Sequence, residues 1–368
     1  MIWDPEKPYN KLPFLPPKAQ FETTEVLKQT ISAREALAAF NARANSLPNP
    51  TILINAIPVL EAQASSEIEN IVTTTDELFS ASVNETNATP AAREALRYRT
   101  ALYAGWEQLG SKPLTSNTAI QVCNALRGHD EGVRRGEVII ANPATKQRRY
   151  TPPVGLDVLN PLLDNWSTFI NDKEGIEPLA RMAAAHYQFE AIHPFTDGNG
   201  RTGRIMNVLM LCDAGLLKYP LLYLSRYIID NKNEYYKLLL AVTADDAWEP
   251  WVKYIIKGVQ STAEYSLRIV DAIEQAQERL VELIRSSMPV VNHDLVSVLM
   301  EQPYCRSRDV MERCRVSKGT AVKWLKTLVD AGILREQKIG RDIVYINLRL
   351  MQVLEGAATN ETHGTFLV

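Results

Sequence analysis

The residues His193–Arg204 read HPFTDGNGRTGR and open directly onto an apolar run, Ile205–Leu211, that predicts a buried helix. A loop that enters a helix through Gly-Asn-Gly, here residues 198–200, points several backbone N–H groups at one place, where the helix dipole also favours an anion. Arg201 and Arg204 lie three positions apart, so both side chains can add contacts to phosphate oxygens. The stretch therefore predicts a phosphate site at the start of a helix.

Two other side chains of this stretch offer groups for chemistry. Asp197 supplies a hard oxygen ligand of the kind that Mg2+ takes together with substrate phosphates. His193 carries an imidazole whose unperturbed pKa suits proton transfer near neutral pH. A glycine-rich turn beside a buried histidine is the structural alternative. The combination of all these groups in one stretch favours a catalytic site.

The stretch resembles the motif HPFxDGNGRxxR of the Fic family and matches it at every fixed position. Proteins of this family typically transfer AMP from ATP to a hydroxyl side chain of a protein. The resemblance implies that His193 is the catalytic base and that Asp197 holds Mg2+. Gly200 favours AMP transfer, because the kinase-like Doc branch of the superfamily has a lysine there. The residues that we expect to bind ATP are Glu69, His193, Gly198, Asn199, Gly200, Arg201, Thr202, Gly203, Arg204, Asn231, Tyr235 and Tyr236.

A second stretch, SSEIEN at residues 65–70, falls within a helix expected over about residues 55–73. It resembles the inhibitory motif [S/T]xxxE[G/N] of Fic proteins, with Ser65 and Glu69 one helical turn apart on the same face. The resemblance implies that Glu69 forms an ion pair with Arg204 and keeps that arginine from the γ-phosphate of ATP. A solvated carboxylate on an ordinary amphipathic helix is the alternative.

Two further segments belong to the expected site. Residues 136–140 and 147–153 are β-prone runs around a turn at Asn142-Pro143, and Fic proteins carry here a β-hairpin flap that holds the target segment by strand addition. The resemblance also places a helix with a tyrosine pair beside the nucleotide. We expect Tyr235 to contact the purine, with Tyr236 and Asn231 behind it; a tyrosine pair in the core is the alternative.

The fold is expected to be mainly α, a Fic helical bundle with the short flap and a small C-terminal domain. Residues 1–92 form an N-terminal extension that includes the inhibitory helix, and residues 93–286 form the catalytic domain. In residues 287–349, three helix-length segments precede two alternating strands, which resembles a winged helix-turn-helix. Residues 350–368 are expected to be a tail, loose from Gly356.

Composition limits the classes of partner. The chain has 368 residues, 46% of them hydrophobic and 23% charged, with a formal net charge of −3, which argues against a protein that binds nucleic acid or membranes through its overall charge. No apolar run is long enough to span a bilayer. The four cysteines show no metal-type spacing, and we expect free thiols in the cytoplasm. Residues 301–349 nevertheless hold eleven Lys or Arg and six Asp or Glu, a local balance of +5 that permits contact with DNA.

These features predict a protein adenylyltransferase that uses ATP and Mg2+ to modify a Tyr, Thr or Ser hydroxyl of a protein, including its own, and that Glu69 inhibits. The expected assembly is a homodimer without membrane contact. One alternative is a nucleotide-sensing regulator that binds DNA through the winged helix. Another is removal of AMP by the same site.

Overall fold

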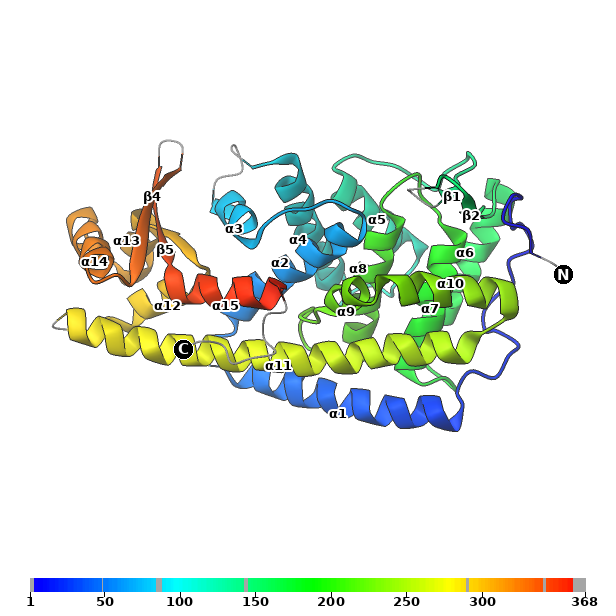
Figure 1. The fold of residues 1–368 in the computed structure, drawn as a ribbon, viewed down its shortest axis with the longest axis horizontal. Coiled ribbons are helices and arrows are strands. Elements are labelled where there is room, and N and C mark those ends of the chain that lie inside the picture. The colour runs from blue at the N-terminus through cyan, green and yellow to red at the C-terminus, as the bar shows by residue number, and fades with distance from the viewer. Residues whose placement is uncertain are drawn as a thin grey trace. The chain divides into compact units, whose positions relative to one another are not determined.

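The structure, a computed structural model, describes residues 3–47, 49–83, 88–141, 145–288, 291–339 and 342–359. Within these ranges the chain forms fifteen α-helices and five short strands (Figure 1). The strands make one two-stranded and one three-stranded antiparallel sheet. The mainly helical fold predicted from the sequence is therefore confirmed. None of the described helices is both long and apolar enough to cross a membrane.

The chain divides into two compact units, and each unit draws on separate parts of the sequence. The first comprises residues 1–41, 68–70 and 97–264, and the second comprises residues 42–67, 71–96 and 265–368. Four helices contribute residues to both units: α1 (Thr24–Ser46), α2 (Thr51–Ile68), α4 (Pro90–Gln108) and α11 (Trp248–Ser287). The predicted domains, in contrast, are consecutive segments of the chain, and their boundaries stay predictions.

The first unit contains the motif and most of the helices around it. Its further elements are α5 (Ser116–Arg127), β1 (Ile140–Ala141), β2 (Arg148–Tyr150), α6 (Leu156–Asn171), α7 (Pro178–Ile192), α8 (Asn199–Asp213), α9 (Leu224–Asp230) and α10 (Lys232–Asp245). The predicted hairpin is present as β1 and β2, which pair in antiparallel fashion. The expected turn residues Asn142 and Pro143 lie outside the described residues.

Helix α7 is buried along almost its whole length and is central to the first unit. The Glu177 side chain caps its first turn, and Pro178 at the first position needs no backbone acceptor. The alanine-rich middle admits two large neighbours, Trp166 and Trp251, whose indole N–H groups donate to α7 carbonyl oxygens. The helix packs against α6 and α8. This packing fixes the position of His193, the residue that follows it.

Helices α1 and α11 are each continuous, over 23 and 40 residues. One helix differs from the expectation. Helix α2 spans Thr51–Ile68 rather than about residues 55–73. Val72, which lies within the expected range, is 72% exposed. The earlier end of α2 follows from Asn70, which adopts a left-handed conformation and so stops the helix.

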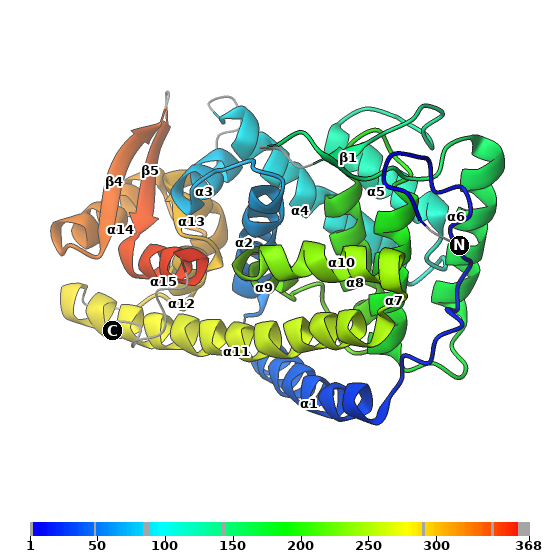
Figure 2. The same cartoon turned by 45° about the vertical axis from the view of Figure 1, so that its right-hand side comes forward.

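The second unit holds the expected C-terminal segments. Its elements are α3 (Thr75–Val83), α12 (His293–Glu301), β3 (Tyr304–Arg306), α13 (Ser307–Cys314), α14 (Lys318–Asp330), β4 (Leu334–Ile339), β5 (Asp342–Asn347) and α15 (Leu348–Thr359). The three predicted helices and the hairpin are confirmed, and β3, which was not predicted, adds a third strand in the order β3-β5-β4. Figure 2 shows the hairpin beside α13 and α14.

Residues 348–359 correct the prediction of a tail that is loose from Gly356. They form helix α15, and its side chains Leu350, Leu354 and Ala357 are fully buried. These positions recur at the spacing of one helical face, which the sequence analysis overlooked. The Tyr265 hydroxyl also donates to the Ala357 carbonyl at 2.8 Å. Residues 360–368 lie outside the described residues.

Candidate active site

The loop between α7 and α8 is held by its own backbone and by one amide side chain. His193 follows α7 in the left-handed conformation (φ 50°, ψ 60°), and its N–H donates to the Phe189 carbonyl at 3.0 Å. Gly198 precedes α8 at φ 83°, a conformation that glycine adopts without strain. The Asn199 side chain accepts from the Phe195 N–H and donates to the Phe195 carbonyl, both at 2.8 Å. Asn199, predicted to bind ATP, therefore braces the loop.

Arg134, which the sequence analysis did not single out, ties this loop to the hairpin. Its guanidinium is 3% exposed and donates to the carbonyl oxygens of His193 (2.7 Å) and Ile192 (3.3 Å). It also donates to Gly136 (2.7 Å), before β1, and to Pro153 (2.6 Å), after β2. A planar guanidinium can serve four carbonyls at once because its donors form a fixed fork. No local pattern in the sequence identifies such a residue.

The N-terminus of α8 is occupied by the carboxylate of Glu69. A Cβ atom built on Gly200 would lie 2.4 Å from Glu69 Oε1 and 2.9 Å from Arg204 Nη1. Any side chain at this position would therefore displace the carboxylate. Backbone N–H groups and the dipole at a helix N-terminus stabilise an anion, and Glu69 supplies that anion here.

Glu69 and Arg204 form the predicted ion pair. Arg204 Nη2 lies 2.9 Å from Glu69 Oε1; the arginine side chain is 1% exposed and the glutamate side chain 35%. Burial opposes the charge of Arg204, but the Glu69 carboxylate, together with Tyr235, Glu190 and Tyr98, raises the pKa of the guanidinium. Removal of Glu69 would leave a buried cation in need of another anion.

The turn that carries Glu69 begins where α2 ends at Ile68. Asn70 has φ 64°, which asparagine and glycine tolerate better than other residues. The N–H of Ile71 then donates to the Ser66 carbonyl at 3.0 Å, a hydrogen bond typical of helix C-termini. The preference for Gly or Asn at this position of the inhibitory motif thus follows from the left-handed conformation of residue 70. Glu69 lies just beyond the helix and not within it.

The imidazole of His193 is neutral at neutral pH. Burial and the nearby Arg134 guanidinium lower its pKa to about 4, while the carboxylates of Glu69 and Asp197 act in the opposite direction. A group with this pKa is uncharged at neutral pH and can therefore act as a base. The arginine that binds the backbone of His193 thus adds to the effect of burial in lowering the pKa of its ring.

Asp197 lies at the open side of the loop. Its carboxylate is 63% exposed, with Oδ2 3.2 Å from Arg127 Nη1 and Oδ1 3.7 Å from Arg201 Nη2. Oδ1 also accepts from the Gly198 N–H at 2.7 Å. The described residues contain no group of three or more acidic, His or Cys side chains that would hold a metal alone. One exposed carboxylate fits Mg2+, which commonly binds one or two carboxylates together with substrate phosphates.

The tyrosine pair is divided between the core and the surface. Tyr235 is 2% exposed, and its hydroxyl is 2.9 Å from His186 Nε2. Burial lowers the pKa of His186 to about 3, so this histidine is neutral and belongs to the core. Tyr236 is only partly buried and packs edge-on against Tyr235 at 5.2 Å between ring centroids. The Asn231 amide donates to the Tyr227 carbonyl at 2.9 Å. Tyr236 is thus the more accessible ring of the pair.

Other predicted residues face the protein interior. Arg201 is 2% exposed, and Thr202 and Ser65 are fully buried. A Cβ on Gly203 would lie 2.6 Å from Glu190 Oε1. Gly203 therefore permits the close approach of α7 and α8.

Glu190 is a second carboxylate that the sequence analysis missed. It lies on the α7 side of the site, is 9% exposed, and its Oε1 makes no hydrogen bond within the described residues. Burial raises its pKa to about 7; Arg204 acts to lower the value and Glu69 to raise it. Glu190 thus gains or loses its negative charge near neutral pH. It does so beside Arg204, whose charge Glu69 neutralises.

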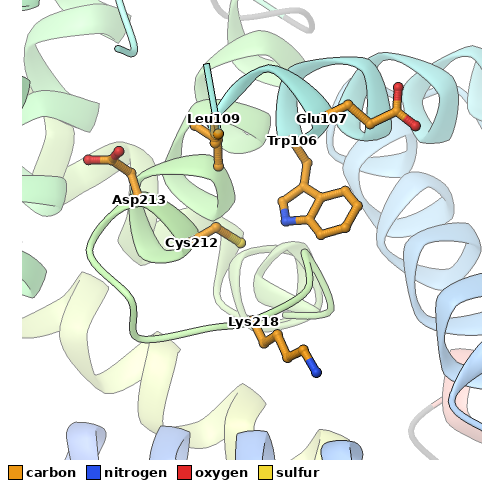
Figure 3. Close-up of a pocket in the computed structure, with 7 residues that line it drawn as sticks. Trp106, Glu107, Leu109, Cys212, Asp213 and Lys218 are labelled. Atoms are coloured by element: carbon orange, nitrogen blue, oxygen red, sulfur yellow. The ribbon is translucent and has the colours of Figure 1, made fainter. Parts of the chain in front are cut away.

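A separate pocket of about 560 Å³ lies near the end of α8 (Figure 3). It is lined by Trp106, Glu107, Leu109, Gly110, Cys212, Asp213 and Lys218. Gly200 is near the start of α8 and Asp213 is at its end, so about 20 Å separate them at 1.5 Å per residue. None of the predicted ATP-binding residues lines this pocket. It is distinct from the phosphate site.

Three family models match the chain. "Fic/DOC family N-terminal" matches residues 27–107, "Fic/DOC family" matches residues 114–211, and "Protein adenylyltransferase SoFic-like, C-terminal domain" matches residues 277–350. The second contains the whole His193–Arg204 stretch.

Curated relatives carry related names. Protein adenylyltransferase fic-1 of Caenorhabditis elegans is 31% identical over 137 residues, which are 36% of this chain and 24% of that protein. Protein adenylyltransferase Fic of Aedes aegypti is 25% identical over 182 residues, 49% of this chain and 34% of that protein. The chain thus spans about a quarter to a third of these relatives.

Two solved structures resemble the fold. A Fic family protein from Desulfovibrio desulfuricans G20 superposes with a TM-score of 0.57 at 19% identity, covering 91% of this chain and 98% of that one. Residues 134–508 of Fic-1 from Caenorhabditis elegans superpose with a TM-score of 0.50 at 20% identity, covering 67% of this chain and 73% of that one. At these identities the likeness concerns the fold alone.

Proposed function

We propose, from the premise that this chain belongs to the Fic/DOC family, that it transfers AMP from ATP to a Tyr, Thr or Ser hydroxyl of a protein. One observation carries the proposal: a carboxylate, Glu69, occupies the anion position at the start of α8 and pairs with buried Arg204. An anion site of this kind suits a nucleotide phosphate once the carboxylate leaves. The names of the curated relatives agree with this activity.

The chemistry follows from the residues around the loop. Neutral His193 accepts the proton of the target hydroxyl, whose oxygen then attacks the α-phosphate of ATP, and pyrophosphate leaves. Backbone N–H groups at the start of α8 stabilise the charge on the phosphate oxygens. Arg204 binds the γ-phosphate in a defined orientation. Tyr236 is our candidate for contact with the purine.

Asp197 is our candidate ligand for Mg2+. The ion would neutralise charge on the phosphates when bound. The role of the protein is to present one exposed carboxylate beside the loop, 3.2 Å from Arg127 at the nearest oxygen. We expect Asp197→Asn to weaken the binding of Mg2+ and so to raise the Mg2+ concentration that gives half of the maximal rate.

Inhibition follows from competition for one cation. With Glu69 on Arg204, a γ-phosphate would meet a carboxylate instead of a free guanidinium, and like charges repel at this distance. ATP then binds in a different pose or weakly. The enzyme is active only in the fraction of molecules in which Glu69 has left Arg204.

The test compares variants with ATP labelled at the α-phosphate. We expect Glu69→Gly to raise label on protein by about tenfold or more, because it removes the competing state. Arg204→Ala in that background should remove most of the gain. Glu67→Gln is the matched control, since Glu67 is exposed on the last turn of α2, and it should behave as the unchanged chain. No label with Glu69→Gly, in a protein that remains folded, would refute adenylylation.

A second candidate function is DNA binding by the C-terminal helices, if they act as a winged helix-turn-helix. Helix α14 exposes Lys318, Lys323 and Lys326, and none of them takes part in an ion pair found among the described residues. Such lysines suit contact with phosphates. Gel shifts on genomic fragments, repeated at increasing salt, test this; an absent or salt-insensitive shift excludes it.

Three finer proposals accompany these. Removal of AMP by the same site would appear as loss of label from a modified protein after ATP is withdrawn. Homodimer formation is testable by light scattering. A cytoplasmic location suits the four free thiols, Cys123, Cys212, Cys305 and Cys314, and fractionation of the source cells would check it.

A further inference from the structure

Lys232 starts α10 and reaches the turn that carries Glu69. Its Nζ donates to the Ile68 carbonyl at 2.6 Å and lies 3.5 Å from Oδ1 of Asn70. These two acceptors belong to the residues immediately before and after Glu69. One ammonium group therefore holds both ends of the short segment from which Glu69 projects.

The place of Lys232 is unfavourable for its own helix. A cation in the first turn of a helix opposes the helix dipole. Ile68, in contrast, is the last residue of α2, where carbonyl oxygens lack partners within the helix and a cation is favoured. The position of Lys232 is thus favourable for the end of α2 and unfavourable for the start of α10.

We propose that Lys232 is the positioning residue for the inhibitory glutamate, an inference that rests on the proposed adenylyltransferase function. By binding the Ile68 carbonyl and the Asn70 amide, it fixes the turn whose geometry places Glu69 over Gly200. Loss of the ammonium group leaves the left-handed conformation of Asn70 and the Ile71–Ser66 hydrogen bond to hold that turn. Glu69 then spends a larger fraction of time away from Arg204.

The experiment measures transfer of AMP from α-labelled ATP in two backgrounds. In the unchanged background, Lys232→Met should raise the rate about tenfold, because the rate scales with the active fraction. Lys232→Arg retains a positively charged hydrogen-bond donor and should keep the rate low. In the Glu69→Gly background, Lys232→Met should change nothing further. Lys237→Met, an exposed lysine of the same helix, is the matched control and should have no effect in either background.

A second readout does not depend on activity. Hydrogen exchange at the Ile71 amide, which donates to Ser66 at 3.0 Å, should be faster in Lys232→Met than in Lys237→Met. If Lys232→Met leaves both rate and exchange unchanged while Glu69→Gly is active, the inference is wrong and the function stands. If Lys232→Met reduces the rate in the Glu69→Gly background, the lysine serves the active enzyme and the inference is equally wrong. An inactive Glu69→Gly chain refutes the proposed function itself.

Discussion

The loop between α7 and α8 and the turn at Glu69 meet at Arg204, but they are held in different ways. The loop is fixed by buried hydrogen bonds. The Asn199 side-chain amide binds both the N–H and the carbonyl of Phe195, and the Arg134 guanidinium donates to four carbonyl oxygens. The turn is fixed by the ammonium of Lys232, which is only partly buried, and by one backbone hydrogen bond.

This difference shows how one site can combine a permanent geometry with a reversible block. Hydrogen bonds to a buried charged group contribute more than exposed ones, and their loss leaves unpaired groups in the interior. The Glu69 side chain is 35% exposed, so water can solvate its carboxylate when it leaves Arg204. Release therefore lets water solvate the carboxylate, and it becomes favourable when another anion, such as a phosphate, neutralises buried Arg204.

The largest effect is expected when the proposed base, His193, is removed from a chain in which Glu69 no longer pairs with Arg204. We expect His193→Ala in the Glu69→Gly background to lower the transfer rate by about a thousandfold, since a general base typically contributes about a hundred- to ten-thousandfold. His129→Ala is the control, because His129 is exposed and should leave the rate unchanged. If His193→Ala retained a tenth of the activity, another group would have to take the proton.

A second prediction concerns Glu190, the carboxylate inside the rigid part of the site. Its pKa in the folded protein, about 7, lies above the ordinary value of 4.5 because the side chain is buried. The stability from its protonation is therefore fully present below pH 4.5 and is lost as the pH rises through 7. Between pH 5 and 8, we expect the loss to be about 1–3 kcal/mol. Glu190→Gln should not show it.

Urea unfolding of both proteins across this pH range measures the effect. The difference in unfolding free energy, variant minus unchanged chain, should shift in favour of Glu190→Gln as the pH rises. Glu174→Gln, at an exposed position, should give a curve parallel to that of the unchanged chain. Parallel curves for Glu190→Gln would mean that the carboxylate ionises in the folded protein as it does in water.

The sequence predicted those parts of the molecule that follow from local patterns. Helix α7 begins at Pro178, a residue type favoured at helix starts, and ends directly before the motif. The Glu69–Arg204 pair was also predicted, through the resemblance of residues 65–70 to a known motif.

The parts that were missed depend on contacts between distant residues. Arg134 binds backbone carbonyl oxygens up to 59 positions away, and Lys232 binds one 164 positions away. A carbonyl is present at every residue, so nothing in the sequence identifies it as a partner. The contact of Tyr235 with the purine was expected from the resemblance and stays a prediction, since a tyrosine pair does not reveal in the sequence which ring faces the core. The structure assigns that buried place to Tyr235 through its hydroxyl contact with His186.

The smallest expected effect tests whether Arg134 acts on the base or only on the fold. We expect Arg134→Met, in the Glu69→Gly background, to lower the rate at pH 8 by about tenfold through a less well-positioned loop. Loss of its charge should also raise the pKa of His193, because the guanidinium now lowers that pKa, so the rate at acidic pH should fall further. Arg135→Met, one residue away and exposed, should change neither. A lower rate with an unshifted acidic limb would reduce Arg134 to a structural brace, since Arg134 acts on the pKa of the ring through its charge and not through its hydrogen bonds.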